Sequence, residues 1–425
     1  MKPYDRFVFD SYSFDPKRRR IELRYSLETS AGSPTNNAIH FTETITFPQD
    51  SRFEVHDAAA LDRALFALHL IGGVSYFKTC CPKTIEVQSG ELSESQAEFW
   101  SQVYEKGLGE FFYRNREKIA YVPGMIHFPS TPNVEAPVLE KRALPPRTLI
   151  TVGGGKDSIV TIEHTPGDTT LLRIGGNPII DQIASIAGKP LITIERTLSP
   201  TLFKLNETGA LNGHVPITAY VSALSVVAAL LYGFTRVLMS NEKSADEGNL
   251  RLDALEVNHQ WSKSREFEEA FSNYLATWVT KDVTYESALR DLSELEVVGA
   301  FSVYPQYFHA FTSCNKNWKI TAAPRGRDSG FTWCCRCPKC AFVFLLLAAH
   351  LPRKTVISIF GHDLFEDESL WPLYEELLAL RGHKPFECVG TPEETRQAFA
   401  MAIERDAGWK DTPILQHMLA AHAHL

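Results

Sequence analysis

A short apolar run that leads directly into three glycines is the feature that most constrains the fold of this chain. Thr148–Val152 has the β-branched, apolar character of a buried strand, and it is followed by Gly153–Gly155 and by a helix that starts at Ser158. Strand-like and helix-like segments then alternate, which is typical of parallel strands joined by right-handed crossovers. We therefore expect an α/β fold with a doubly wound parallel sheet. The further elements that the pattern predicts are Thr170–Ile174, Ile179–Ala187, Leu191–Ile194, Ala219–Tyr232 and Arg236–Met239.

The residues before this sheet show a different sequence pattern, which is typical of antiparallel strands. Along residues 21–26 apolar side chains alternate with polar ones, which places one face of a strand against a core. Residues 41–47 alternate in the same way, except that Glu43 interrupts the apolar face. Two half-buried strands are therefore expected here, the second with a carboxylate where an apolar residue belongs.

Helical patterns follow these strands. Ser95 with Glu98 three residues later fits a capping box at the start of a helix. Residues 133–146 are rich in proline and separate these helices from the parallel sheet, which is typical of a domain boundary. We predict a smaller α+β N-terminal domain over residues 1–143. Residues 144–425 would then form the doubly wound domain, with a cysteine metal site and C-terminal helices.

Charge and apolar runs restrict the class of protein. The 425 residues carry a formal net charge of -8, which argues against a nucleic-acid-binding protein, because such proteins usually show a basic excess. The N-terminal segment lacks the apolar core of a signal peptide. Ile217–Phe234 is uncharged and near the lower length limit of a membrane span, but the strand-like segments on both sides favour a helix buried against a sheet. We expect a cytoplasmic protein without a membrane span.

The glycine-rich segment 153–158 combines the groups that bind phosphate. Glycines allow a tight turn and the close approach of an anion, and successive N–H groups at a helix start supply positive potential. Ser158 adds a hydroxyl, Asp157 adds an oxygen ligand for Mg²⁺, and Lys156 either meets a phosphate or points to solvent. The alternative is a glycine-rich turn without a ligand. The residues that we predict to bind ATP are Gly153, Gly154, Gly155, Lys156, Asp157 and Ser158.

This segment is not a Walker A motif, because Ile150 stands where that motif has its first glycine and Asp157 follows the lysine. It resembles the Ser-Gly-Gly-x-Asp-Ser signature of the PP-loop ATP pyrophosphatases, with Gly153 in place of the first serine. The resemblance implies that ATP is cleaved between its α- and β-phosphates and that AMP is transferred to a carboxylate or a similar oxygen. The missing serine removes one hydroxyl donor from the loop.

Eight cysteines are present, and four of them crowd into seven residues. Without a secretory signal, such crowding favours metal binding over disulfides. Cys334, Cys337 and Cys340 have the spacing of thiolates that reach one ion from a tight turn, and Cys314 would complete a tetrahedral set with Cys335 as a bystander. A structural zinc ion is the first expectation, and an iron–sulfur cluster or uncoordinated thiols stay open as alternatives.

Other polar residues lie where ligands of a parallel sheet are expected. Asn241, Glu242 and Lys243 follow a predicted strand, and such sheets bind ligands beyond the carboxyl ends of their strands. His214 precedes the long apolar helix, either as a nucleotide contact or as a hydrogen-bonding partner at the helix start. Two arginines that precede the cysteine cluster in the sequence would bind diphosphate or carboxylate. The alternative is that they are solvent-exposed surface residues without a ligand. The residues that we predict to bind substrate are His214, Asn241, Lys243, Arg325 and Arg327.

A strong helix start follows the last cysteine. Thr391 as N-cap, Pro392 at the first helical position and Glu394 three residues after the cap form this signal. Glu387 and Cys388 therefore lie just upstream of a positive helix end, where the pKa of a thiol falls and where either group would serve as a proton carrier. The alternative for Cys388 is an inert buried cysteine.

Taken together, these segments resemble one family, the ATP-dependent UDP-N-acetylmuramoyl-L-alanyl-L-glutamate epimerases of peptidoglycan synthesis. The resemblance covers nearly the whole chain and is far more specific than the loop alone. It implies that the terminal L-Glu of a UDP-linked muramyl dipeptide is inverted to D-Glu, with ATP converted to AMP and diphosphate. The matching segments are Gly-Val-Ser-Tyr-Phe-Lys at 73–78, Gly-Leu-Gly-Glu-Phe-Phe at 107–112, Gly-Gly-Gly-Lys-Asp-Ser at 153–158, Asn-Glu-Lys-Ser-Ala at 241–245, the cysteines of 334–340, and Lys-Pro-Phe-Glu-Cys-Val-Gly at 384–390.

The family pattern does not identify the proton carriers, so the predicted catalytic residues rest on their positions: Asp157, Glu242, Glu387 and Cys388. Two other functions stay open. A carboxylate-adenylating enzyme that forms an amide or nitrile, similar to 7-cyano-7-deazaguanine synthase, would share the loop and the cysteine site, but those chains are shorter. A non-catalytic ATP-binding module is the alternative from another class, and the intact Asp157 and Ser158 argue against it.

Overall fold

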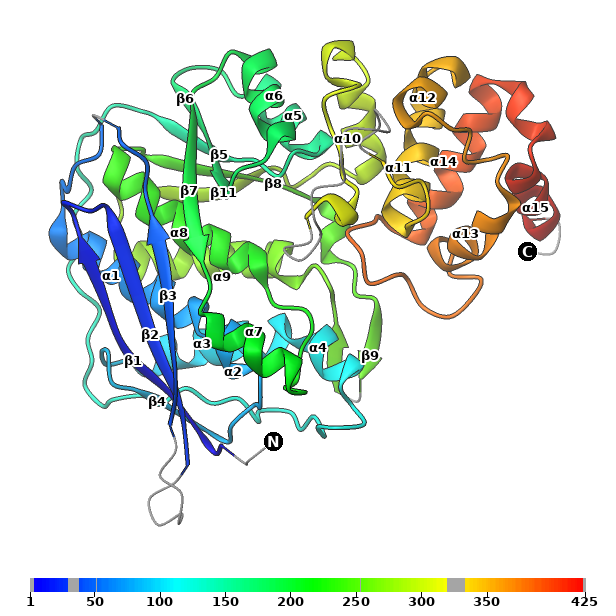
Figure 1. Cartoon of the computed structure of the whole chain (residues 1–425). Coiled ribbons are helices and arrows are strands. Elements are labelled where there is room, and N and C mark those ends of the chain that lie inside the picture. The colour runs from blue at the N-terminus through cyan, green and yellow to red at the C-terminus, as the bar shows by residue number, and fades with distance from the viewer. Residues whose placement is uncertain (1–3, 30–37, 51, 253, 319–332, 423–425) are drawn as a thin grey trace.

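The computed structural model describes residues 4–29, 38–50, 52–252, 254–318 and 333–422. Its largest element is a sheet of nine strands in the order β11-β8-β5-β6-β7-β3-β2-β1-β4 (Figure 1). A separate hairpin is formed by β9 (Leu250–Leu252) and β10 (Leu255–Val257). The strands of the large sheet are β1 (Arg6–Asp15), β2 (Arg20–Glu28), β3 (Ile39–Thr46), β4 (Thr84–Val87), β5 (Thr148–Thr151), β6 (Thr169–Ile174), β7 (Leu191–Thr197), β8 (Arg236–Glu242) and β11 (Thr284–Leu289).

Five neighbouring strands, β11, β8, β5, β6 and β7, are parallel to one another. The chain runs from β5 through β6 to β7 on one side and then crosses back, so that β8 and β11 lie on the other side of β5. The strand order therefore reverses between β5 and β8, and α/β sheets bind their ligands at the carboxyl ends of strands at such a switch point. The α/β fold is confirmed, and each strand expected here begins within one residue of the observed strand.

The other part of the sheet is mostly antiparallel. β2 pairs with β1 and β3 in antiparallel fashion, and β4 lies parallel to β1. β3 also pairs with β7, through Thr44 opposite Thr197, so the two parts form one continuous sheet. The hydrophobic core on one face likewise contains residues from both sides of position 143. The domain boundary at that position therefore stays a prediction.

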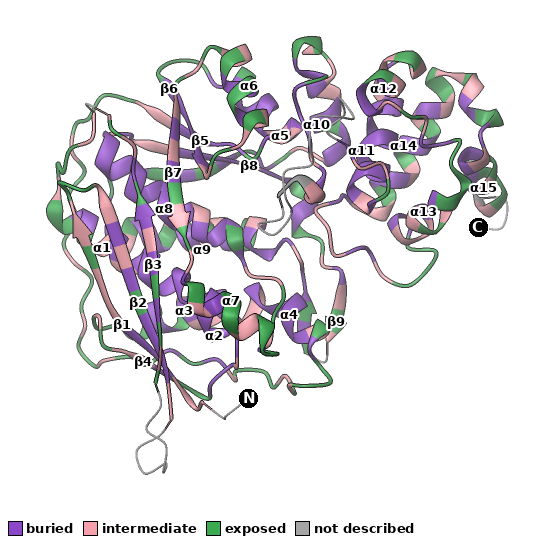
Figure 2. Cartoon of the chain, viewed as in Figure 1, coloured by how far each residue is buried: buried purple, intermediate pink, exposed green. Residues whose placement is uncertain are grey.

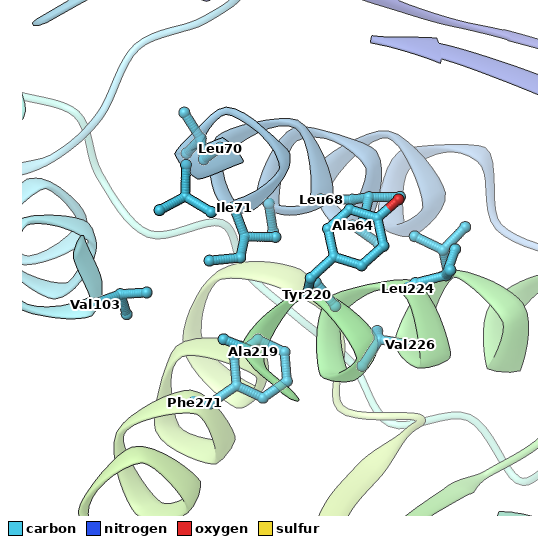
Figure 3. Close-up of a cluster of buried hydrophobic side chains, with 14 of the residues drawn as sticks. Ala64, Leu68, Leu70, Ile71, Val103, Ala219, Tyr220, Leu224, Val226 and Phe271 are labelled. Atoms are coloured by element: carbon cyan, nitrogen blue, oxygen red, sulfur yellow. The ribbon is translucent and has the colours of Figure 1, made fainter. Parts of the chain in front are cut away.

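Helices cover both faces of the parallel strands. Leu149 of β5 and Val237 of β8 face one core, whereas the adjacent Ile150 and Leu238 face another. On the first face α1, α8 and α9 pack together, as Figure 3 shows for their apolar side chains, and α5 and α6 lie on the second face (Figure 1). The helices are α1 (Ala58–Gly72), α2 (Val74–Phe77), α3 (Glu94–Gly107), α4 (Gly109–Arg114), α5 (Lys156–His164), α6 (Pro178–Ala187), α7 (Pro200–Glu207), α8 (Ile217–Tyr232), α9 (Arg265–Tyr274), α10 (Glu294–Phe301), α11 (Pro338–His350), α12 (Arg353–Phe360), α13 (Trp371–Leu377), α14 (Pro392–Arg405) and α15 (Pro413–His422).

The uncharged segment expected to be a buried helix is α8. Apart from Ile217 and Val221, every residue of α8 is buried (Figure 2), which explains why its sequence is apolar on all sides. Within the described residues, one stretch, Ala58–Phe77, reaches the length and hydropathy of a membrane span. Its apolar window is 78% buried inside the protein, as expected for a core helix.

The capping box predicted at Ser95 is wrong by two residues. The N-cap of α3 is Ser93, whose hydroxyl accepts the N–H of Gln96, and the Gln96 side chain accepts the N–H of Ser93. Both residues of this pair are buried, whereas Ser95 and Glu98 are exposed, so the cap forms where it also satisfies buried polar groups. The helix ends at Gly107, and α4 follows as a separate helix.

The five C-terminal helices, α11 to α15, form a layer beside the carboxyl ends of the parallel strands (Figure 1). α11 is buried almost throughout and packs against α14. The start predicted for α14 is confirmed: Thr391 and Glu394 form a capping box around Pro392. This layer brings the segment that carries Glu387 and Cys388 next to the sheet.

Glu43, the residue that interrupts the apolar face of β3, is completely buried. Its two carboxylate oxygens accept hydrogen bonds from Arg196 of β7 at 2.9 and 3.1 Å, from Tyr220 at 2.7 Å and from Tyr76 at 2.9 Å. The guanidinium of Arg196 also lies over the Tyr220 ring, 3.6 Å from its centroid. A buried carboxylate with this set of donors is compatible with a core position, and it joins β3, β7 and two helices.

Candidate active site

The glycine loop lies at the end of β5 and opens α5. Gly154 has φ +78°, a left-handed conformation that glycine adopts without strain. The N–H of Gly153 donates to Ser158 Oγ at 3.0 Å, and the N–H of Thr312 donates to the Gly154 carbonyl at 3.0 Å. A Cβ at Gly155 would lie 2.9 Å from Ser313 Oγ, so a larger residue there would require this hydroxyl to rotate away. The loop is thus a preformed turn whose N–H groups lie at a helix N-terminus.

Lys156 does not point to solvent, one of the two possibilities left open for it. Its side chain is fully buried, and its Nζ contacts the carboxylates of Asp157 and Glu294. Burial alone would lower the pKa of Lys156, but the charges of Asp157 and Glu294 outweigh burial and raise it. Lys156 therefore stays an ammonium ion that holds Asp157 at the mouth of the loop.

Glu294, at the start of α10, is the centre of a buried charge cluster. It contacts Lys156 and accepts a hydrogen bond from Lys339 Nζ at 3.3 Å. Burial would raise the pKa of Glu294, but these two cations lower it to about 2. Its backbone N–H donates to Glu394, 2.7 Å away, which also accepts the hydroxyl of Ser244 at 2.7 Å. The cluster thereby joins the loop, the end of β8 and α14.

Glu242 is buried and is the last residue of β8, the strand that lies across the switch point from β5. Burial, together with the nearby charge of Glu294, raises the pKa of its carboxyl to about 7. The charge of Asp157 acts in the same direction, whereas Lys263 opposes it. Two carboxyl groups, Asp157 and Glu242, therefore flank the loop end of the sheet.

Cys388 is half-buried and lies among cations. Lys263 Nζ is 3.4 Å from its Sγ, and the side chain of His259 forms a hydrogen bond with the same sulfur. Burial would raise the pKa of the thiol, but Lys263 and His259 lower it to about 5. The carbonyl of Cys388 accepts a hydrogen bond from Lys339. The adjacent Glu387 accepts one from Asn315.

His259 in turn is bound to Glu110 of α4. Its Nδ1 hydrogen-bonds to Glu110 Oε2, and its pKa rises to about 9 because hydrogen bonds to Cys388 and Glu110 outweigh the effect of burial. His214 lies beside the pair, with its Nδ1 3.5 Å from the same Glu110 oxygen. Burial lowers the pKa of His214 to about 3. One neutral and one protonated imidazole thus share a single carboxylate.

The remaining predicted substrate-binding residues are less closely tied to this cluster. Asn241 is buried, and its amide donates to Ser287 Oγ at 3.0 Å on the neighbouring strand β11. Lys243 is exposed. Arg325 and Arg327 lie outside the described residues. Substrate contacts of these four residues stay predictions.

The structure brings the four predicted thiols together. The sulfur atoms of Cys314, Cys334, Cys337 and Cys340 all lie within 4.8 Å of one another, a spacing that suits four ligands of one tetrahedral ion. Cys335 points elsewhere, with its Sγ 3.6 Å from the carbonyl of Phe360. Because all four donors are thiols and no fifth one is present in the group, the cluster suits a closed structural zinc site.

A cavity of about 460 Å³ lies at the opposite end of the parallel strands, next to the amino ends of β5 and β8. Its three arginines are paired with carboxylates: Arg52 with Asp50, Arg142 with Asp282 and Arg147 with Asp168. The candidate functional residues therefore lie at the carboxyl ends of the strands, whereas this cavity lies at the amino ends.

Several residues of the site were not predicted from the sequence. Glu110 lies within the Gly-Leu-Gly-Glu-Phe-Phe segment, which contributes to the family resemblance but assigns no role to this glutamate. Lys339 lies between two cysteines of the cluster, but its charge carried no signal of its own. His259, Lys263 and Glu294 stand in segments without a recognisable pattern, and only the fold places them near the loop.

Comparison with known proteins identifies the chain's relatives. The family model described as the MurL N-terminal domain matches residues 1–288, and the one described as the MurL C-terminal domain matches residues 310–425. No solved structure matches the chain.

Three curated relatives bear the name UDP-N-acetyl-alpha-D-muramoyl-L-alanyl-L-glutamate epimerase. The protein from Xanthomonas oryzae pv. oryzae is 43% identical over 85% of this chain and 79% of its own length. Those from Micromonospora sp. and Salinispora tropica are each 38% identical over 99% of this chain, and over 92% and 90% of their own lengths. Since the N-terminal family model alone matches more than half of the residues, the chain belongs to the MurL family.

Proposed function

We propose that this protein inverts the terminal L-Glu of UDP-N-acetylmuramoyl-L-alanyl-L-glutamate to D-Glu and that it consumes ATP, with release of AMP and diphosphate. The printed name of its relatives supports the substrate and the inversion. The observation that carries the ATP dependence is the glycine loop at the switch point of the sheet, with buried carboxylates beside it.

The loop supplies the groups that an adenylating enzyme needs. Its N–H groups and the N-terminus of α5 would bind the phosphates, as the PP-loop resemblance implies. Asp157 and Glu242 offer carboxylate oxygens at this edge, the donor type that Mg²⁺ prefers, so the residues present fit that ion. Bound Mg²⁺ would neutralise charge on the departing diphosphate. Lys156 would keep Asp157 oriented through the contact between their side chains.

Adenylation makes the inversion chemically accessible. Removal of the α-proton from a free carboxylate would create a second negative charge beside the first, which is very unfavourable. Transfer of AMP to the α-carboxylate of the terminal glutamate turns this group into a mixed anhydride, so the carboxylate charge beside Cα is removed. The α-proton is then acidic enough for a protein side chain to remove, and water finally releases AMP.

The cysteine cluster would play a structural part in this scheme. Four thiolates around zinc leave no open position for water, so the ion would shape the site without taking part in the reaction. Asn315, next to Cys314, donates to Glu387, and Lys339, next to Cys340, contacts the carbonyl of Cys388. Zinc would therefore hold two of the segments that surround the substrate. The eight cysteines form no disulfide with one another, which supports a reducing, cytoplasmic location.

The test combines purified protein with ATP, Mg²⁺ and the UDP-linked L-Ala-L-Glu muramyl precursor. AMP is quantified, and the chirality of glutamate is determined after acid hydrolysis. We expect D-Glu to appear together with AMP, and neither product without ATP. AMP without inversion would point to another carboxylate reaction, as in the amide- and nitrile-forming enzymes. Absence of both products from folded, zinc-loaded protein would overturn the proposal.

A further inference from the structure

Cys388 occupies a position that is unusual for a structural cysteine. It lies in the loop before α14, and two cationic side chains, Lys263 and His259, reach its sulfur from the segment that precedes α9. An inert cysteine in a core is surrounded by apolar groups, whereas this sulfur has hydrogen-bond donors on two sides. The arrangement therefore favours the thiolate form of Cys388.

The geometry around His259 extends this arrangement into a chain of three groups. The imidazole hydrogen-bonds to the sulfur of Cys388, and its Nδ1 hydrogen-bonds to Glu110 Oε2. Arg114, one helical turn after Glu110, contacts the other carboxylate oxygen. A carboxylate that fixes an imidazole, which in turn contacts a nucleophilic or basic atom, is a recurring arrangement for control of protonation.

Asn249 fixes the two segments relative to each other. Its amide donates to the carbonyls of Lys384 and Pro385, at 3.2 and 2.8 Å, in the segment that leads to Cys388. Its carbonyl oxygen accepts the N–H of His259 at 2.8 Å. A single buried side chain therefore sets the distance between the imidazole and the thiol, although the two residues are far apart in the sequence.

We propose that Cys388 is the catalytic residue that removes the α-proton of the adenylated glutamate, and that His259, Lys263 and Glu110 are positioning residues that hold it as a thiolate. This assignment rests on the function proposed above. In the step, the Cα–H bond breaks, its electron pair moves toward the acyl carbonyl to give an enolate, and Cys388 gains the proton as a thiol. A protonated group or water on the opposite face then supplies a proton to Cα, which restores the carbonyl, and the thiol returns its proton to solvent.

Two other predicted carriers fit this step less well. Glu387 is engaged by Asn315, and burial and the charge of Cys388 raise its pKa. Glu242 lies at the end of β8 near Asp157, on the side of the phosphate loop. The charged groups that face Cys388 are Lys263, His259, Lys339 and Glu387, so cations predominate around the sulfur.

The first experiment separates adenylation from proton transfer. The wild type and Cys388→Ala are incubated in D2O with ATP, Mg²⁺ and either the L-Glu precursor or its D-Glu epimer. Diphosphate release in the first turnover, which reports adenylation, and deuterium at Cα are both measured. We expect Cys388→Ala to release diphosphate at close to the wild-type rate, while deuterium incorporation from at least one epimer falls by about 10²–10⁴-fold, the usual contribution of a general base. Cys388→Ser serves as a second variant if the alanine variant does not fold, and Cys80→Ala is the matched control with unchanged rates.

Each outcome decides the assignment. Loss of exchange with diphosphate release retained supports it, and the affected epimer identifies the face that Cys388 serves. Undiminished exchange from both epimers overturns it. Loss of diphosphate release in a folded variant also overturns it, because Cys388 would then act in adenylation. If the wild type forms no AMP, the proposed function fails and the assignment fails with it.

The second experiment tests the positioning residues through pH. The rate at which iodoacetamide alkylates Cys388 is followed by mass spectrometry across a pH series in the wild type and in His259→Gln. Because the variant removes a cation next to the sulfur, the midpoint of alkylation should rise by about 1–3 pH units, and the acidic limb of the exchange rate should rise with it. If both midpoints stay where they are in the wild type, His259 does not hold the thiolate, and its proposed role is wrong.

Discussion

Two groups of buried carboxylates in this molecule have opposite surroundings. Glu43, between β3 and β7, accepts four hydrogen bonds from Arg196, Tyr220 and Tyr76. Glu242 and Glu294, at the carboxyl ends of the parallel strands, lie close enough to each other for their charges to interact. Both groups are removed from water, but the first is one carboxylate with a full set of donors and the second brings several carboxylates and lysines together.

The difference separates structure from function. A carboxylate whose oxygens are all engaged has no capacity for a ligand, and its role is to join elements. Carboxylates held near like charges cost free energy, and such clusters persist where a ligand or a reaction uses them. The Glu43 group is therefore expected to govern stability, and the cluster around Lys156 and Glu294 to govern activity.

The largest expected effect is on stability, from Arg196→Leu. The variant leaves Glu43 buried without its cation, and breaking a buried pair in this way costs about 3–5 kcal/mol of unfolding free energy. Urea unfolding followed by circular dichroism measures this loss. AMP formation by the folded fraction should stay at the wild-type level. An unchanged unfolding free energy would mean that Glu43 is neutralised in some other way, and the comparison would break down.

A double variant sharpens this prediction. Glu43→Leu combined with Arg196→Leu removes both charges, so no buried ion is left unpaired, and it should be more stable than Arg196→Leu alone. If the double variant is instead the less stable of the two, the pair contributes through packing and through the hydroxyls of Tyr76 and Tyr220.

Lys156→Met tests the other group. Without the ammonium ion, Asp157 loses the contact that orients it at the loop, and we expect AMP formation to fall by about 10²–10³-fold, as when one preorganised electrostatic contact is removed from an active site. Lys339 still contacts Glu294, so the loss of stability should be smaller than in Arg196→Leu. Initial rates of AMP formation at saturating ATP provide the measurement. A variant that is strongly destabilised yet fully active would reverse the roles of the two groups.

The two groups also differ in how far the sequence predicts them. The loop residues are contiguous, so glycines, a strand before them and a helix after them suffice to predict that Asp157 and Ser158 bind ATP. The alternating pattern likewise predicted β5 to β8 and the buried α8. Glu110 lies far in the sequence from His259 and Lys263, and no local motif includes these three residues. Their role could not be predicted because it depends on contacts that form only when distant segments pack together. The partners of Glu43 were hidden for the same reason, although its place on an apolar face was visible.

Glu242→Gln tests whether the acidic cluster carries electrostatic strain. The pKa of Glu242 is raised from 4.5 to about 7, so the folded protein holds this proton more tightly than the unfolded chain does. The resulting stabilisation is complete below pH 4.5 and is lost as the pH rises through about 7. It amounts to at most about 3 kcal/mol. Glutamine stays neutral, so the unfolding free energy of the variant should fall less between pH 5 and about 8 than that of the wild type.

The pH series for this variant needs a matched control. Glu296→Gln alters an exposed carboxylate of α10 whose pKa is lowered by hydrogen bonds from Ser293, so it should not remove the loss of stability near neutral pH. Parallel pH profiles for the wild type and Glu242→Gln would show that Glu242 is already ionised in the folded protein. The acidic cluster would then resemble the Glu43 group.

The smallest effect is expected from Lys243→Ala, which tests how far the functional region extends beyond the buried cluster. Lys243 is exposed and directly follows Glu242, so its substitution should change the unfolding free energy by no more than about 0.5 kcal/mol. An exposed cation that meets an anionic substrate contributes up to about 1 kcal/mol, so KM for the UDP-linked precursor should rise by at most about fivefold, with kcat unchanged. Steady-state kinetics at two salt concentrations provide the measurement, because salt weakens a surface ion pair. A KM equal to that of the wild type at both concentrations would remove Lys243 from the substrate site and confine function to the buried groups.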